Sequence, residues 1–401
     1  MKHPSTQGAR IVAPVFHRLL DRIDRGLEAG GIEADLPDGT HRRLGLRADG
    51  PVAIVRLHRW RALVRLATGG SIGWYEAWVA GDWSSPDPVP LFDLFMRNRR
   101  SLGETARASG PARLAARLLH WRRRNDPRGA RRNIAEHYDL GNDFYGEWLD
   151  PSLTYSSALF ERDDEPLEAG QRRKLGAILD RTAAKPGDRI LEIGCGWGSL
   201  ALLAAERGLH VDGLTLSTEQ KAVVERRARE AQAPGIRVLL QDYREVTGSY
   251  DAVASIEMVE AVGQEFWPAY LDTVARVLAP GGRAAIQFIS IADDVFESYA
   301  RNVDFIQRYV FPGGMLISQS RFRALAEERG LAWTEQRDFG GCYARTLKDW
   351  RIRFDAAVAE RQLPPRFDAA FVDLWRYYLM YCEGGFRGGG IDVSQVTLVK
   401  R

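Results

Sequence analysis

The chain has 401 residues, enough for two or three domains, and its hydrophobic content of 45% is typical of a folded protein. No apolar run approaches the ~20 residues that span a bilayer, and the polar N-terminus is unlike a secretory signal. The three cysteines are far apart and the seven histidines form no metal-binding motif. We therefore expect reduced thiols, no metal site and a cytoplasmic protein.

Residues 1–96 are expected to form a small α+β domain. Its predicted elements are a helix over residues 16–27, a hairpin of strands 32–36 and 43–46 around Pro37-Asp38-Gly39, and strands over 52–57 and 62–67. The aromatic-rich segment 74–83 is interpreted as a core or interdomain cluster and not as a ligand cage. Aromatic residues in this domain could also support a homodimer.

Residues 97–132 are predicted to be a basic linker with amphipathic helices. The segment holds twelve arginines against two acidic residues, although the whole chain carries a net charge of only +3. Two sets of its residues fall on different helical faces, the apolar Leu114, Leu118 and Trp121 and the basic Arg113, Arg117 and Arg124. This pattern fits a helix that lies on an anionic membrane surface, and it equally fits a helix packed on its own domain.

Residues 133–401 alternate between predicted strands and helices. The strands are expected over 189–193, 209–214, 236–240, 251–256, 282–289, 331–339 and 393–399, and the clearest helices over 165–182, 346–360 and 368–382. This order predicts an α/β fold, namely the Rossmann-like seven-stranded sheet of class I methyltransferases with a late hairpin-like edge. Residues 290–316 interrupt the alternation and are interpreted as an inserted lid over the site.

A glycine-rich loop follows the first strand of that sheet. The strand ends at Glu192 and runs into Gly194, Gly196 and Gly198, which let the backbone approach a ligand at a helix N-terminus. The next two strands end in the segments Thr215–Gln220 and Gln241–Arg244, at the spacing of successive β-α units. The implied ligand is a nucleoside, and the lack of a G-x-x-x-x-G-K-[ST] motif argues against a nucleoside triphosphate. S-adenosylmethionine is the predicted cofactor.

Five further segments carry a narrower signature. They are His137–Tyr145, Leu153–Ser157, Glu257–Gly263, Phe311–Gly314 and Tyr377–Arg387. Together they resemble the cyclopropane-fatty-acyl-phospholipid synthase family, which includes the mycolic acid cyclopropane synthases. The resemblance runs over residues 133–401 and extends more weakly to the N-terminal domain.

The resemblance implies methyl transfer from S-adenosylmethionine to a cis double bond in a phospholipid acyl chain. The alkene attacks the sulfonium methyl group, a carbocation forms, and loss of a methyl proton closes a cyclopropane ring. An enzyme with this substrate is expected to associate peripherally with the inner face of the membrane. Seven aromatic residues fit the lining of such a site, or ordinary core: Phe144, Tyr145, Trp148, Phe288, Phe305, Tyr309 and Phe311.

The same resemblance assigns the cofactor contacts. Glu192 and the three glycines are expected at the methionine and ribose end, with Tyr155 and Ser156 closing over the methionine. The expected contacts around the ribose and the adenine are Thr215, Leu216, Ser217, Gln220, Gln241, Asp242, Tyr243 and Arg244. Each of these residues also has a simpler interpretation as a helix cap, and Ser217 with Gln220 forms a capping-box pattern.

In related members the base is a bicarbonate ion held by a cysteine, a glutamate, a histidine, an isoleucine backbone group and a tyrosine. The glutamate, isoleucine and tyrosine match Glu260, Ile289 and Tyr343, but Ser157 replaces the cysteine and Gln287 the histidine. Neutral donors could still hold bicarbonate, or Glu260 or another group accepts the proton. If a hydride shift came first, the product would be a methyl- or methylene-branched chain and not a ring.

Cys382 matches a family cysteine that was once proposed as catalytic. Attack by an alkene needs no thiolate, so a structural or lining role is expected for Cys382. Two other classes of protein are alternatives, a methyltransferase acting on nucleic acid or a small molecule, and a non-catalytic binding protein. No amino-methylation motif of the D/N-P-P-Y type and no recognised RNA-binding module are present, so nucleic acid is not expected as a partner.

Overall fold

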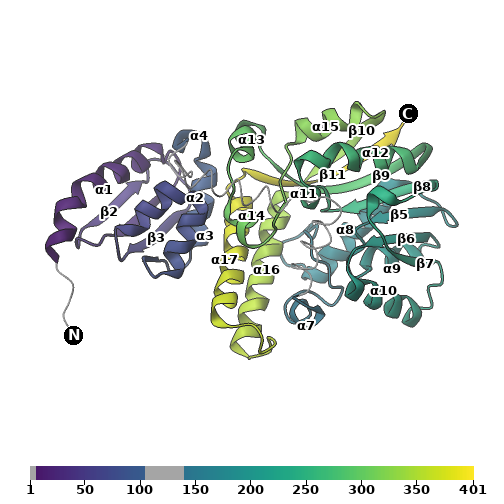
Figure 1. Ribbon diagram of the computed structural model, residues 1–401, viewed down its shortest axis with the longest axis horizontal. Helices are drawn as coiled ribbons and strands as arrows, with labels where there is room; N and C mark the ends of the chain where they lie inside the picture. The colour runs from purple at the N-terminus through teal and green to yellow at the C-terminus, as the bar shows by residue number, and fades with distance from the viewer. Residues whose placement is uncertain (1–5, 104–139) are drawn as a thin grey trace. The chain divides into compact units, whose positions relative to one another are not determined.

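The computed structural model describes residues 6–103 and 140–401, with side chains from residue 14 onward (Figure 1). Within the described residues the chain divides into two compact units. The first is drawn from Met1–Arg122, Asp294–Val310 and Ala369–Ile391, and the second from Arg123–Asp293, Phe311–Asp368 and Asp392–Arg401. The predicted basic amphipathic helix lies outside the described residues, so the expected linker over 97–132 stays a prediction.

The first unit contains a four-stranded sheet with the strand order β2-β1-β3-β4. Its N-terminal elements are α1 (Thr6–Gly26), β1 (Gly31–Asp35), β2 (His41–Gly45), β3 (Val52–Leu57), α2 (Arg61–Val79), β4 (Trp83–Ser84), α3 (Val89–Arg97) and α4 (Arg99–Leu102). Strand β1 pairs antiparallel with β2 and parallel with β3. The predicted hairpin is confirmed, since Asp35 pairs with His41 across the turn.

The predicted strand over residues 62–67 is wrong, because these residues lie in helix α2. Ala62, Leu63 and Leu66 are buried at a helical spacing. Arg61 and Arg65, one turn apart, both reach the buried carboxylate of Asp82, at 2.9 and 3.3 Å. The short alternation in the sequence is therefore overridden by tertiary contacts that only a helix allows.

The aromatic-rich segment 74–83 lies in the core of the first unit, as one of the two interpretations predicted. The rings of Trp74 and Trp83 stack at 4.4 Å, and the Trp83 indole donates a hydrogen bond to the Trp74 carbonyl. Tyr75 packs against Phe305 of α14 (Phe305–Tyr309) and Tyr377 of α17 (Ala369–Arg387), with centroids 4.8 and 4.9 Å apart. These aromatic contacts join sequence segments about 230 to 300 residues apart.

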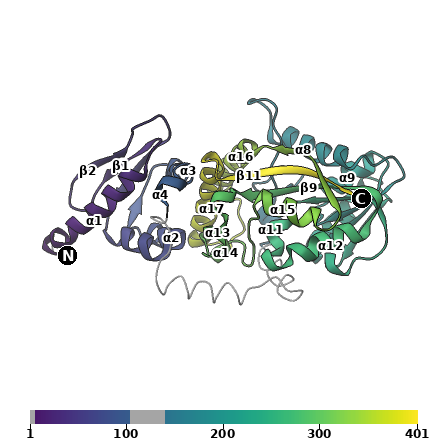
Figure 2. The same cartoon turned by 90° about the horizontal axis from the view of Figure 1, so that it is seen from above.

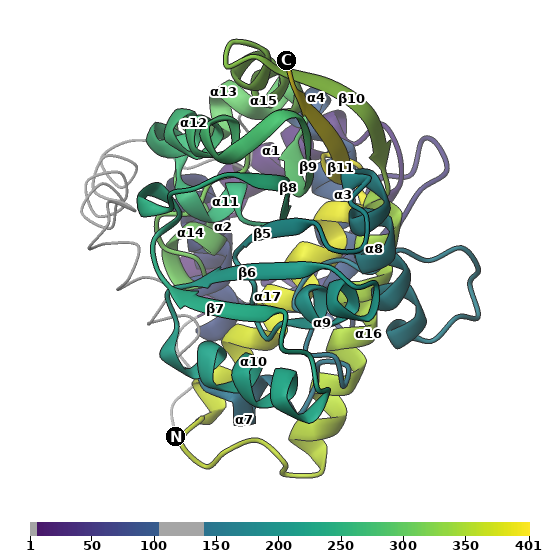
Figure 3. The same ribbon diagram turned by 90° about the vertical axis from the view of Figure 1, so that its right-hand side faces the viewer.

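The second unit is built on a seven-stranded sheet with the strand order β10-β11-β9-β8-β5-β6-β7 (Figure 3). The strands are β5 (Arg189–Ile193), β6 (His210–Thr215), β7 (Ile236–Leu240), β8 (Tyr250–Ile256), β9 (Leu278–Ile291), β10 (Leu331–Asp338) and β11 (Ile391–Lys400). Strands β7, β6, β5, β8 and β9 pair in parallel, and β10 pairs antiparallel with β11 at the edge. The predicted class I methyltransferase sheet is confirmed.

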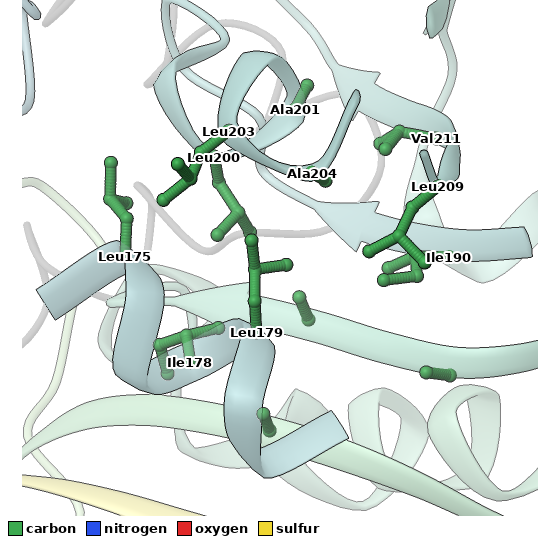
Figure 4. Close-up of a cluster of buried hydrophobic side chains, with 13 residues drawn as sticks. Leu175, Ile178, Leu179, Ile190, Leu200, Ala201, Leu203, Ala204, Leu209 and Val211 are labelled. Atoms are coloured by element: carbon green, nitrogen blue, oxygen red, sulfur yellow. The ribbon is translucent and has the colours of Figure 1, made fainter. Parts of the chain in front are cut away.

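Helices cover both faces of this sheet, with α8 and α9 on one side and α12 and α15 on the other (Figure 2). The helices of the second unit are α7 (Asn142–Tyr145), α8 (Leu167–Thr182), α9 (Ser199–Glu206), α10 (Thr218–Glu230), α11 (Val259–Val262), α12 (Trp267–Val277), α15 (Gln319–Glu327) and α16 (Gly340–Ala359). Leu175, Ile178 and Leu179 of α8 bury one helical face, and Leu179 points toward Leu200 of α9 (Figure 4). Each such leucine stabilises the fold by about 1.5–3 kcal/mol.

An inserted segment follows strand β9. It leaves the sheet after Ile291 and returns at Ile317, where the Ile291 N–H donates to the Ile317 carbonyl at 3.0 Å. Between these residues lie α13 (Asp293–Ala300) and α14, and residues Asp294–Val310 group with the first unit. The expected role of residues 290–316 as a lid stays a prediction.

Residues 6–103 and 140–401 lack two classes of feature. No helix in these ranges is long and apolar enough to cross a bilayer. The same ranges contain no group of three His, Cys, Asp or Glu side chains that could hold a metal ion.

Candidate active site

A pocket opens in the second unit where strands β5, β6 and β8 end. It has about 1140 Å³ of empty space, part of which is open to solvent. The carboxyl ends of parallel strands are where α/β sheets bind ligands, because the strand-to-helix loops meet there. Most of the residues predicted for the cofactor line this pocket: Tyr155, Ser156, Glu192, Gly194, Gly196, Thr215, Leu216, Gln220, Gln241, Asp242, Tyr243 and Arg244.

The three glycines of the loop differ in what surrounds them. Gly196 has a φ of 49°, lines the pocket, and would find no heavy atom within 4 Å of an added Cβ. Gly194, with φ 83°, lies against Met258, whose sulfur would be 2.4 Å from such a Cβ. Gly198 does not line the pocket and instead allows close packing against Val224 of α10, whose Cγ1 would be 2.7 Å from an added Cβ. Gly196 therefore leaves a cradle that a side chain would fill.

The turn after β6 is fixed by short-range hydrogen bonds. The Ser217 hydroxyl accepts from the Gln220 N–H at 3.2 Å, so Ser217 caps α10 as predicted. The Gln220 side chain does not complete a capping box, because its amide oxygen accepts from the Thr215 hydroxyl at 2.9 Å. This contact holds Gln220 at the pocket wall, while Ser217 does not line the pocket.

The turn after β7 is closed by an internal ion pair. Asp242, which is 1% exposed, accepts from the backbone N–H of Arg244 at 3.0 Å and from its guanidinium at 2.7 and 2.8 Å. Burial raises the pKa of the neighbouring Tyr243 phenol to about 12, so this ring stays neutral. The turn thus presents a neutral aromatic ring and a neutralised carboxylate to the pocket.

A buried lysine, which the sequence analysis missed, faces the acidic end of β5. Lys174 of α8 donates to the Ser156 hydroxyl at 2.5 Å and lines the pocket with Glu192. Burial lowers the pKa of Lys174 to about 8 and raises the pKa of Glu192 to about 8. One Glu192 oxygen, Oε2, is buried without a hydrogen-bond partner. The sequence held one signal for this buried charge, because Lys174 stands at a core-facing position of the predicted helix, one residue before Leu175.

A second acidic cluster lies where β8 ends. Glu257 Oε1 accepts from the Ser157 N–H at 2.9 Å and from the Gln287 amide at 2.8 Å, and Oε2 accepts from the Tyr343 hydroxyl at 2.8 Å. Burial raises the pKa of Glu257, and Lys174 and the three donors oppose that rise. Glu257 lines the pocket, whereas Ser157, Gln287 and Tyr343 do not.

Glu260 lies three residues further along, in α11, and accepts a short hydrogen bond from the Ile289 N–H. Its other oxygen, Oε2, is buried without a hydrogen-bond partner. Burial, and secondarily the neighbouring Glu257, raises the pKa of Glu260 to about 8. Ionising both Glu257 and Glu260 would place two like charges side by side in a buried site, which costs free energy. Near neutral pH Glu260 therefore holds its proton.

The four donor groups expected around bicarbonate are therefore already engaged. The amide of Gln287 and the hydroxyl of Tyr343 donate to Glu257, and the Ile289 N–H donates to Glu260. The Ser157 hydroxyl, expected to face the ion, instead donates to the Ala158 carbonyl at 2.9 Å. A bicarbonate ion here would face the carboxylate of Glu257, and the four donors expected to hold the ion are already bonded to other groups, so these residues do not fit bicarbonate.

The seven aromatic residues expected to line the site lie in separate places. Phe144, Tyr145 and Trp148 form one cluster with Tyr155 and Trp197, and in it the Tyr145 and Tyr155 rings are 5.3 Å apart. The other four are divided: Phe288 packs against Phe322 and Trp333, Phe305 and Tyr309 lie in the first unit, and Phe311 begins a turn. Sequence position alone could not separate them, because which aromatic side chains meet depends on the tertiary fold.

The remaining candidate, Cys382, lies on α17 in the first unit and does not line the pocket. Burial and the nearby Asp304 raise the pKa of its thiol far above the ordinary value. Burial has the same effect on the pKa of Cys195 in the glycine loop. Neither thiol is therefore poised to act as a thiolate near neutral pH.

The sheet and the glycine loop define the second unit as a class I methyltransferase, and solved methyltransferases share this fold. Residues 125–396 match the family model described as mycolic acid cyclopropane synthetase. The chain belongs to this family, and it is an S-adenosylmethionine-dependent methyltransferase that modifies lipid acyl chains.

Relatives and solved structures cover different shares of the chain. A tuberculostearic acid methyltransferase from Mycobacterium tuberculosis is 37% identical over 365 residues, or 86% of this chain and 82% of that protein. The cyclopropane-fatty-acyl-phospholipid synthase of Escherichia coli is 37% identical over 265 residues, 65% of this chain and 66% of that protein. A mycolic acid cyclopropane synthase crystallised with SAH and CTAB superposes with a TM-score of 0.64 at 32% identity, over 67% of this chain and 98% of that one.

Proposed function

We propose that the chain transfers a methyl group from S-adenosylmethionine to the cis double bond of an unsaturated phospholipid acyl chain. Loss of a proton from the transferred methyl group then closes a cyclopropane ring. The observation that carries this proposal is a single pocket that joins an open glycine cradle at Gly196 to the carboxylate of Glu257. The family and the cyclopropane synthases among its relatives support the reaction.

The cofactor is assigned to the glycine end of the pocket. Bound there, it supplies an electrophilic methyl group. Gly194 and Gly196 provide close backbone approach, and the unpartnered Oε2 of Glu192 provides a buried polar atom for a hydrogen bond. Thr215, Leu216 and Gln220 are assigned to the ribose, and Gln241–Arg244 to the adenine, with Tyr155 and Ser156 over the methionine. Ser217 and Gly198 support this end through helix capping and packing.

The reacting carbon atoms require a dry site, because water would convert the carbocation to an alcohol. Apolar residues supply much of the pocket wall: Leu153, Leu175, Ile193, Ile256, Met258 and Val262. The faces of Tyr155 and Trp197, which also line the pocket, can stabilise a passing positive charge without attacking it. These features support alkylation of an apolar chain in this pocket.

A second candidate product is a methyl- or methylene-branched acyl chain. The tuberculostearic acid methyltransferase matches 86% of this chain, against 65% for the cyclopropane synthase of Escherichia coli. Ser157 and Gln287 also depart from the pattern expected for ring-forming relatives. Both products share the first carbon–carbon bond, and they differ in whether a hydride shift precedes loss of the proton.

The lipid substrate implies contact with a membrane surface at the inner face, from a cytoplasmic location. The twelve arginines of residues 97–132 would favour anionic lipid, through attraction of about 1 kcal/mol for each basic residue near the surface. Co-sedimentation with anionic and neutral vesicles, beside retention on RNA, tests this partner. A homodimer is also proposed, and light scattering of the full chain tests it.

Mass spectrometry of lipids tests the reaction. The full chain is incubated with S-adenosylmethionine and vesicles of cis-unsaturated phospholipid. A gain of one CH₂ that resists mild hydrogenation supports the ring, and the same gain with uptake of hydrogen supports the branched alkene. No gain on any lipid would contradict the proposed function.

A further inference from the structure

We infer that Glu257 is the general base of this enzyme, a carboxylate built into the chain at the place where related members are expected to bind bicarbonate. The inference rests on the proposed function, since it names the group that accepts the proton in that reaction. It differs from the assignment expected from the sequence, in which Glu260 was the matching carboxylate.

The position of Glu257 relative to the pocket favours it over its neighbours. Glu257 lines the pocket together with Glu192 and Gly196, whereas Glu260 does not. A base must come within hydrogen-bond reach of the proton it removes, and a carboxyl group behind the pocket wall cannot do so. Of the two carboxyl groups in this cluster, Glu257 is therefore the one that can meet the acyl chain.

Three donors from three different parts of the second unit hold the Glu257 carboxylate. They are the Ser157 N–H from the loop before α8, the Gln287 amide on β9 and the Tyr343 hydroxyl on α16, all within 2.9 Å. Donors that converge on a carboxylate stabilise its charged form, which is the form that accepts a proton. They also fix its position, as general-base catalysis requires.

The orientation of the Gln287 amide is set by a further layer. Its oxygen accepts from the Gln395 amide at 3.0 Å, so its nitrogen is the end that donates to Glu257. The Gln395 oxygen in turn accepts from Arg181 at 3.3 Å. This series of hydrogen bonds runs from Arg181 through Gln395 on β11 and Gln287 on β9 to Glu257. The groups directly behind the carboxylate are therefore neutral amides, and the guanidinium is further away. The site is thus built to hold an anion that the chain itself supplies.

The charged groups around Glu257 agree with this role. Lys174 of α8 provides a positive charge, and Glu260 of α11 provides a carboxyl group that stays protonated near neutral pH. Tyr343 of α16 is the remaining titratable contact. Glu257 can therefore carry the negative charge of the cluster while Glu260 remains neutral.

The backbone at Glu257 has a left-handed conformation, which is uncommon for a residue other than glycine. Its φ of 53° lies in the left-handed region, which a residue with a side chain adopts at a cost of about 1–3 kcal/mol. Glycine adopts this conformation without that cost. Glu257→Gly should therefore keep the fold while it leaves three donors facing an empty space of carboxylate size.

The proposed proton transfer balances without any further reactant. Methyl transfer forms a carbon–carbon bond and leaves a cation on the neighbouring alkene carbon. A C–H bond of the transferred methyl group then breaks, its proton passes to Glu257, and its electron pair closes the ring. If a hydride shift comes first, a proton of the transferred methyl group passes to Glu257 and the electron pair of that C–H bond forms the C=CH₂ double bond of a methylene branch.

The test compares lipid methylation by the wild type, Glu257→Gln and Glu257→Gly in buffer freed of carbon dioxide and in buffer with added bicarbonate. Removing a general base typically costs about 10²- to 10⁴-fold in turnover, so both variants should lose activity by that factor. Wild-type activity should not change with bicarbonate. Bicarbonate or formate should restore part of the activity of Glu257→Gly, but none to Glu257→Gln, whose amide fills the space.

Calorimetric titration with S-adenosylhomocysteine gives a readout that does not depend on turnover. Both variants should bind it within about twofold of the wild type, as should the exposed control Glu230→Gln, which should also keep full activity. Retained activity in Glu257→Gln, or a wild type that stops without bicarbonate, would overturn the inference while leaving the proposed function intact. A wild type that methylates no lipid under either condition would instead contradict the proposed function.

Discussion

The two ends of the pocket are built in different ways. The glycine end is made by neighbouring strand-end loops joined through backbone hydrogen bonds, such as those that the N–H groups of Gly194 and Cys195 donate to the Leu214 carbonyl at 3.1 and 2.9 Å. The carboxylate end is assembled from four separate segments of the chain, with Glu257 held by one backbone N–H and two side chains from residues 100, 30 and 86 positions away.

This difference suggests which properties can change independently. The glycine end depends on backbone conformation, so it tolerates few substitutions. Its role in holding the cofactor is the same whichever product the methyl transfer gives. The carboxylate end depends on a few side chains, so exchanging them can alter the base without disturbing the cofactor loops. Binding of the cofactor and transfer of the proton should therefore respond to different substitutions, and three further changes test that separation.

The largest effect is expected for Gly196→Val. A side chain there would fill the open cradle, and we expect affinity for S-adenosylhomocysteine to fall at least about 100-fold, or about 2.7 kcal/mol, by calorimetric titration. Gly187→Val is the matched control, because Gly187 also has a positive φ and open space but does not line the pocket. Equal losses in both variants would attribute the effect to backbone strain and contradict the cradle.

A smaller effect is expected for Tyr343→Phe at the opposite end. Loss of one donor to Glu257 should lower turnover about tenfold. The Tyr343 hydrogen bond lowers the pKa of Glu257, so its removal should move the acid limb of the pH–rate profile to higher pH. Affinity for S-adenosylhomocysteine should stay unchanged. An unshifted profile would mean that Glu257 does not set the acid limb.

The smallest effect concerns stability. Because the pKa of Glu260 is raised to about 8, the stability that this group contributes is complete below its ordinary pKa and is lost as the pH rises toward 8. Between pH 5 and pH 7.5 the wild type should lose about 1 kcal/mol relative to Glu260→Gln, allowing for partial solvent exposure. Urea unfolding of both proteins at several pH values measures this. Parallel pH dependences would show that Glu260 ionises normally.

Much of the fold could be predicted from the sequence because its signals are local. The strands of the large sheet were placed to within a few residues by apolar runs, and the cofactor loops by glycines and polar residues at the strand ends. The short segment 62–67 was misassigned because its alternation spans too few residues to exclude a helix, and the contacts of Arg61 and Arg65 with Asp82 decided its structure.

The carboxylate end could be predicted only in part. Glu260, Gln287 and Tyr343 were identified by their places in the family pattern, but their partner Glu257 was not, because no group was expected at that position. One signal was available, since Glu257 directly follows a predicted strand and stands three residues before another glutamate. The sequence does not show that donors on β9 and α16 bind the Glu257 carboxylate, because only the tertiary fold brings them together.

The most direct test of the central claim uses S-adenosylmethionine with a fully deuterated methyl group. The full chain is incubated with it and with cis-unsaturated phospholipid vesicles, and the acyl chains are analysed by mass spectrometry. The account predicts acyl chains that gain a CD₂ unit, because one deuteron of the transferred methyl group is lost to the base. Acyl chains that retain an intact CD₃ group, or that carry no label at all, would contradict it.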